Sequence, residues 1–161
     1  MKLRLMFPPT PEFAAKHAEL MVRTAKEISG VDLDFTPGSL EAVDEIVEQF
    51  RQDGITEQQI GETLFGFGCY LGEVLVRQIG AVWRASEDTP MRESAGFQMV
   101  VDLGSDKFCN PIGKVFKRLK NGPEDSLPYF YQVFSQRDQP TISSTDEGPR
   151  KPGFWRRMLG K

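Results

Sequence analysis

The fold is decided by the stretch from Thr56 to Arg84, which reads TEQQIGETLFGFGCYLGEVLVRQIGAVWR. Apolar residues recur along it every three or four positions, which is the spacing of a helix that buries one face. A second apolar stripe follows the same spacing, so the helix is apolar over most of its circumference. Helices of this kind are normally surrounded by other elements. We therefore predict one long central helix that stops at Gly80 and leads directly into a strand.

Glycine occupies four interior positions of this helix, and each costs about 1 kcal/mol relative to alanine. The four are Gly61, Gly66, Gly68 and Gly72. Bare backbone allows a neighbouring strand or helix to lie close, and we predict such packing at Gly68 and Gly72. The alternative is that a ligand approaches the backbone there. The sequence GFGCYLG is not a phosphate loop, because it lacks the Lys-Ser/Thr ending and does not follow a strand.

One polar stripe interrupts the apolar surface of the helix. It contains Tyr70, Glu73 and Arg77, and is called the polar stripe below. Glu73 and Arg77 are four positions apart in the order that favours an ion pair. The pair can hold a helix surface or a neighbouring loop, or the stripe can form the wall of a binding pocket. A buried Glu73 needs a partner, because an unpaired buried charge is costly.

The rest of the chain predicts an α+β domain. Helices are expected over 11–29, 39–53, 111–120 and from 123 onward, and an antiparallel meander over 81–84, 97–103 and 107–110. We expect a single domain over residues 1–135, with a helical layer around the central helix and a small antiparallel sheet packed on it. A chain of this size buries enough surface to need no disulfide or metal. No cofactor is expected.

The pattern Gly68-x-Tyr70-x-Gly72-Glu73, followed by Gly80 and Trp83, resembles a motif of bacterial proteins from a family of unknown function. In that pattern Leu-Asp-Phe-Thr-Pro-x-Ser-Leu precedes the helix, as at residues 33–40, and Pro-x-Gly-Lys-Val-x-Lys follows it, as at residues 111–117. The resemblance covers about residues 30–135. It implies a short, helix-rich α+β domain and carries no catalytic activity with it.

Charge is unevenly distributed, although the net charge is only −3. Residues 12–62 carry twelve acids and four bases, whereas residues 107–120 carry five bases and no acid. An acidic domain argues against general nucleic-acid binding. We predict that the second helix offers a basic protein partner an acidic face, or else keeps that face solvated; the face comprises Glu41, Asp44, Glu45 and Glu48. The bases of residues 114–120 are interpreted as a solvated face, as a complement to this helix, or as a site for an acidic partner or phosphate.

The chain ends in a polar stretch followed by FWRRMLGK at residues 154–161. The polar stretch, residues 136–153, has the composition of a flexible linker. The final segment combines aromatic and basic residues, beginning with Phe154, Trp155, Arg156 and Arg157. It is expected to dock on a partner, to fold back onto an apolar groove of the domain, or to make weak peripheral contact with an anionic membrane.

These features favour a non-enzymatic, intracellular protein-binding module such as an inhibitor, an immunity-type protein or an adaptor. His17 is the only histidine and is expected to be structural, and Cys69 and Cys109 lack ligand spacing. The alternative is a small-ligand-binding domain or a hydrolase-like enzyme that uses a pocket at the polar stripe. With no signal peptide and no run of 18 apolar residues, the expected location is cytoplasmic.

Overall fold

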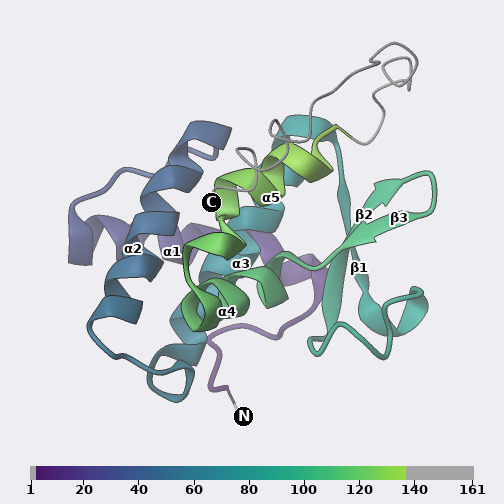
Figure 1. The fold of residues 1–161 in the computed structure, drawn as a ribbon. Coiled ribbons are helices and arrows are strands. Elements are labelled where there is room, and N and C mark those ends of the chain that lie inside the picture. Colours follow the sequence, from purple (N-terminus) through teal and green to yellow (C-terminus); the bar gives the residue numbers. More distant parts are fainter. Residues whose placement is uncertain (1–2, 137–161) are drawn as a thin grey trace.

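The structure is a computed structural model that describes residues 3–136 (Figure 1). It confirms the predicted α+β fold, with helices and strands in this order: α1 (Ala14–Ser29), α2 (Leu40–Gln52), α3 (Glu57–Ile79), β1 (Val82–Ala85), β2 (Met99–Gly104), β3 (Lys107–Cys109), α4 (Pro111–Asn121) and α5 (Leu127–Phe134). Short 3-10 turns precede α1, α2 and α5 and follow β1. The predicted tail contacts at Phe154, Trp155, Arg156 and Arg157 lie outside the described residues.

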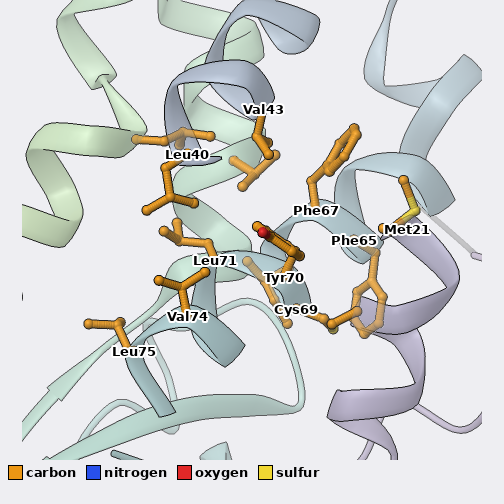
Figure 2. Close-up of a cluster of buried hydrophobic side chains, with 14 of the residues drawn as sticks. Met21, Leu40, Val43, Phe65, Phe67, Cys69, Tyr70, Leu71, Val74 and Leu75 are labelled. Carbon is orange, nitrogen blue, oxygen red and sulfur yellow. The ribbon is translucent and has the colours of Figure 1, made fainter. Parts of the chain in front are cut away.

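Helix α3 is the centre of the domain, with α1 and α4 packed most extensively against it (Figure 1). Its side chains from Leu64 to Leu75 are all buried, and Figure 2 shows the cluster that several of them form with Met21 of α1 and Leu40 and Val43 of α2. At its start, the Thr56 backbone N–H donates to the Gln59 side chain at 2.8 Å. It ends at Gly80, whose φ of 74° is left-handed, as glycine permits.

Three glycines of α3 lie directly against neighbouring elements. A Cβ at Gly66 would collide with the Met21 side chain of α1, one at Gly68 with the Ile112 Cα of α4, and one at Gly72 with the Trp83 ring of β1. The prediction of close packing at Gly68 and Gly72 is therefore confirmed. Protein atoms, not a ligand, occupy the space beside these two residues.

The three strands form an antiparallel meander in the order β1-β2-β3, on one side of the helices (Figure 1). Trp83 of β1 pairs with Val101 of β2, and Val101 pairs with Cys109 of β3. The sheet reaches the central helix through the ring of Trp83. Within residues 3–136, no helix is long and apolar enough to cross a membrane.

The segment between α1 and α2 has two local features that the pattern of the sequence leaves open. The Ser39 side chain does not cap the second helix: the Thr36 Oγ1 accepts the Ser39 backbone N–H at 3.3 Å one turn earlier, and the Ser39 Oγ donates to the Thr36 carbonyl at 2.6 Å. Residues 31–35, whose alternation fits either a short strand or an extended connector, form no strand, which leaves the connector. Their backbone ends at Phe35 with a left-handed φ of 63°.

Gly68→Leu tests the close approach of α3 and α4. The new side chain would collide with backbone at Ile112, which cannot rotate away as a side chain can. We expect the free energy of unfolding in urea to fall by about 1–3 kcal/mol. Leucine favours a helix over glycine by nearly 1 kcal/mol, so a loss of stability must come from the contact and not from helix propensity.

Gly38→Ala is the matched control for this substitution. A Cβ at Gly38 would meet its nearest atom, the Thr36 Oγ1, at 4.0 Å. This variant should be as stable as the parent chain. A Gly68→Leu variant that is also as stable as the parent would contradict the packing argument.

Candidate functional site

The side chains of the polar stripe on α3 find their hydrogen-bond partners within the fold. The Tyr70 hydroxyl accepts the Phe35 backbone N–H at 2.7 Å and lies 2.7 Å from the Ser39 Oγ. The Phe35 and Tyr70 rings lie 4.7 Å apart between centroids. Burial raises the pKa of the Tyr70 hydroxyl above its usual range. Tyr70 therefore joins α3 to the connection that leads into α2.

Glu73 is buried and uses both carboxylate oxygens. Its Oε1 accepts from the Arg77 Nε and its Oε2 from the Trp83 Nε1, each at 3.1 Å. The Arg77 guanidinium lies 3.6 Å from the centroid of the Phe35 ring, a cation–π contact, and its outer nitrogen is 3.6 Å from Glu19. The predicted ion pair is present, and it links α3 to β1 and to the loop before α2.

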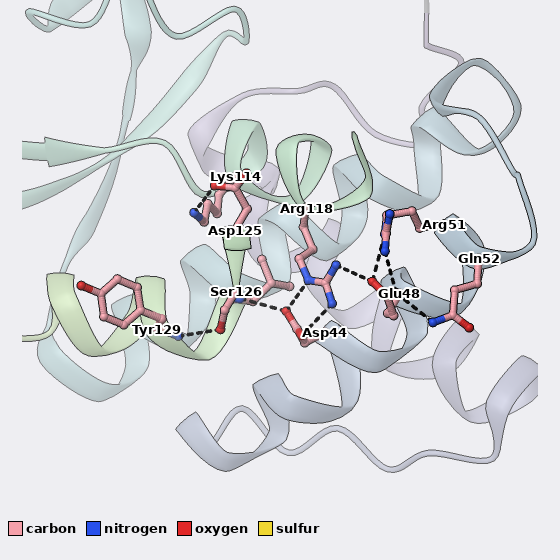
Figure 3. A network of polar contacts seen from close by, with 10 residues as sticks. Asp44, Glu48, Arg51, Gln52, Lys114, Arg118, Asp125, Ser126 and Tyr129 are labelled. Carbon is pink, nitrogen blue, oxygen red and sulfur yellow. Dashed lines mark hydrogen bonds and ion pairs between the residues drawn. The ribbon is translucent and has the colours of Figure 1, made fainter. Parts of the chain in front are cut away.

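The acidic face predicted on α2 is divided by the fold. Arg118 of α4 is 2 % exposed; its Nε and Nη2 donate to Asp44 at 2.9 and 3.1 Å, and its Nη1 donates to Glu48 at 2.7 Å (Figure 3). The Leu127 backbone N–H also donates to Asp44, at 2.9 Å. The prediction that all four carboxylates face a partner is therefore wrong for Asp44 and Glu48. Only Glu41 and Glu45 of the predicted face are exposed.

The basic helix α4 is likewise only partly exposed. Arg118 was predicted to be exposed with the neighbouring lysines, but it packs beneath the surface because the α2 carboxylates satisfy its guanidinium. Lys114 donates to Asp125 at 2.7 Å, whereas Lys117 and Lys120 are exposed. Of the interpretations offered for this cluster, complementing the acidic second helix holds for Arg118.

A groove with a volume of about 950 Å³ lies between the amino-terminal segment and the helices. One wall is the irregular segment 3–9, and the rest comes from the start of α3, the loop before β2, and α4. Apolar side chains line it, including four phenylalanines, although polar atoms form nearly as much of its exposed surface; the principal side chains are Leu3, Leu5, Met6, Phe7, Phe65, Phe97 and Phe116. Glu57 and Gln98 supply polar groups. None of Tyr70, Glu73 and Arg77 belongs to the lining.

His17 holds the amino-terminal wall of the groove in place. Its Nε2 donates to the Pro8 carbonyl at 2.9 Å. Its ring meets Phe7 and Phe65 edge-on, with centroids 5.5 and 5.0 Å apart. Near the start of the wall, the Arg4 backbone N–H donates to Glu62 at 2.7 Å. The lone histidine is structural, as predicted, and it positions one side of the groove.

The lining of the groove offers a limited set of chemical groups. Glu57 is the one ionisable side chain in its lining, without a second group to share a proton transfer. Cys69 and Cys109 are buried elsewhere, and burial raises the pKa of both thiols. Among residues 3–136, no three His, Cys, Asp or Glu side chains gather closely enough to hold a metal.

Sequence reasoning missed the groove. Its amino-terminal wall comes from LRLMFPP at residues 3–9, which was considered only as a possible signal sequence. The alternation of Leu3, Leu5 and Phe7, followed by two prolines, was the available signal. It is typical of an extended segment with one apolar side.

Fold and groove together define a small, helix-rich α+β domain with a partly apolar groove on its surface. Residues 12–110 match the model of a family described as "Family of unknown function (DUF6278)", and the chain belongs to this family. The match begins earlier than the predicted resemblance and ends before the segment 111–117. Comparisons with curated proteins and with solved structures gave no match.

The Arg118 network predicts a specific dependence of stability on pH. Hydrogen bonds first from Arg51 and then from Arg118 and Gln52 lower the pKa of Glu48 to about 2, from an ordinary value of 4.5. A carboxyl whose pKa is lowered on folding stabilises the fold above its unfolded pKa. This contribution is lost progressively as the pH falls from about 4.5 towards about 2.

Urea denaturation of the parent chain and of the Glu48→Gln variant, measured across this pH range, tests the pH dependence. The difference in unfolding free energy between the parent and this variant should shrink as the pH falls from about 5 to about 3. Glu45→Gln, on the same helix but exposed, is the control and should show a smaller change. A difference between parent and Glu48→Gln that stays constant over the range would contradict the assignment.

Proposed function

We propose that this chain is a non-enzymatic protein-binding module whose groove takes an apolar, aromatic segment of a partner. The observation that carries the proposal is the groove itself, which is lined by four phenylalanines, of which Phe7 and Phe97 are partly exposed, and by a single carboxylate. Met6 stands at its rim with 69 % of its surface exposed. Exposed apolar residues around a concave surface are a feature of interaction sites.

The size and shape of the groove favour a chain segment over a small molecule. Its volume of about 950 Å³ is at the upper end of the range of about 300–1,000 Å³ for small-molecule clefts. It is partly open to solvent, and one of its walls is a chain segment without helix or strand structure. A peptide with two or three large apolar side chains would fill the lining, and a base next to them would meet Glu57.

The proposal places the module in the bacterial cytoplasm, as an inhibitor, immunity-type or adaptor protein. Its two described cysteines are unpaired, which suits a reducing compartment. A catalytic role at the polar stripe has less support, since the Tyr70 hydroxyl and both Glu73 oxygens already have partners within the fold.

A displayed library of random peptides tests the binding preference directly. It is selected on the full chain and on the Phe154→Ser/Trp155→Ser double variant, in which the chain's own aromatic segment cannot compete. We expect enrichment of peptides that carry large apolar or aromatic residues next to Lys or Arg. Met6→Asp should weaken the selected peptides at least tenfold, since it places a charge on the apolar rim.

Val133→Asp is the matched control, because Val133 is an exposed apolar residue of α5, 42 % exposed, and does not line the groove. It should leave peptide affinity unchanged. Failure to enrich any apolar and basic sequence on either form of the chain would overturn the proposed function. Equal losses for Met6→Asp and Val133→Asp would also overturn it, because binding would then lie elsewhere.

A further inference from the structure

The chain carries a segment of the kind that the groove would accept. Residues 154–159, Phe-Trp-Arg-Arg-Met-Leu, place two aromatic residues and two other large apolar residues around two bases. They lie beyond Gln136, where the described structure ends. Resting on the proposed function, we infer that this segment occupies the groove of its own chain and must leave before a partner segment can bind.

The chemistry of the two surfaces is complementary. The groove offers the partly exposed rings of Phe7 and Phe97, and the buried Phe116 packs behind Phe97 with the two ring centroids 5.0 Å apart. Aromatic side chains favour such surroundings, where offset and edge contacts add to the burial of apolar area. Glu57 gives the lining a negative charge, and Arg156 and Arg157 directly follow the two aromatic residues of the segment.

The connection is long enough to reach the groove. Seventeen residues, 137–153, separate Gln136 from Phe154. Extended, they span about 56 Å at about 3.3 Å per residue. A compact domain of this size is about 36 Å across, from a radius of gyration of about 14 Å. The longest path over its surface is half of its circumference, about 57 Å. The extended connection is therefore just long enough to reach any side of the domain.

Because the segment is tethered to the domain, it can occupy the groove even if its own affinity is weak. A short connection holds its segment at an effective concentration in the millimolar range. If the segment alone bound with a dissociation constant of about 0.1 mM, the groove would be occupied in about nine chains out of ten. A partner segment would then bind the full chain about tenfold more weakly than a chain whose own segment is disabled.

A contact-quenching measurement on the full chain tests occupancy of the groove. Met6→Cys places a thiol on the exposed rim, and a bimane label attached there is quenched by a tryptophan in contact with it. The native thiols of Cys69 and Cys109 are buried, so the introduced thiol reacts first. We expect the label to be dimmer when Trp155 is present than in the matched Trp155→Phe chain. Any quenching by Trp83 is the same in both chains, so the difference between them reports on Trp155.

A second label position serves as the control. Ile28→Cys lies at the far end of α1, eleven positions beyond His17, and Ile28 is 57 % exposed. Its bimane emission should not depend on Trp155. Equal dependence at both positions, or none at Met6→Cys, would overturn the inference. Quenching that grows with protein concentration would assign the segment to the groove of a second copy, and a Trp155 effect seen only with anionic vesicles would assign it to a membrane; either result also overturns it.

Peptide affinity separates this inference from the function on which it rests. A peptide selected from the library should bind the Phe154→Ser/Trp155→Ser chain about tenfold more tightly than the full chain. Equal binding to both chains would overturn self-occupancy and leave the groove as a partner site. Binding to neither would overturn the proposed function.

Discussion

The arrangement of the whole domain depends on the absence of side chains at Gly66, Gly68 and Gly72 of α3. Each glycine receives an atom of a different element, from α1, α4 and β1. This close approach compensates for the helix propensity that the glycines give up, about 1 kcal/mol each. The site depends on it as well, since the position of α4 at Gly68 sets where Phe116 closes the groove. The Trp83 ring at Gly72 similarly lies where its indole N–H can reach Glu73.

Two charged clusters then fix the elements around α3. Glu73 joins α3 to β1 and, through Arg77, to Phe35, while Arg118 joins α4 to α2 and Asp44 extends the contact to α5. Charges removed from water are costly unless they are paired and fully hydrogen-bonded, and here each has more than one partner. Such clusters add little net stability, but an arrangement that broke them would leave an uncompensated charge. They therefore favour one packing of the helices over its alternatives.

Most of the fold could be predicted from the sequence because its signals are local. The apolar spacing and the glycines of α3, the position of Gly80, and the three strands all follow from neighbouring residues. The burial of Arg118 could not be predicted in this way. Along the chain Lys117 and Lys120 look equivalent to it, and only the contact with the α2 carboxylates distinguishes Arg118 from them. Ser39 was similarly misassigned, since Thr36 offers the same kind of oxygen one turn earlier. The groove was missed because its walls come from distant segments that carry no chemical motif.

Only part of the groove lies within the residues that match the family model. Its floor, with Glu57, Phe65 and Phe97, lies within the matched residues 12–110, whereas the wall 3–9 and Phe116 lie outside them. The wall contacts the rest of the domain through His17 and Glu62, through the Phe7 ring, which stacks on Phe13, and through Leu3 and Leu5, which pack against the core. The shape of one side of the groove is therefore set by seven residues that lie outside the part of the chain matched by the family model.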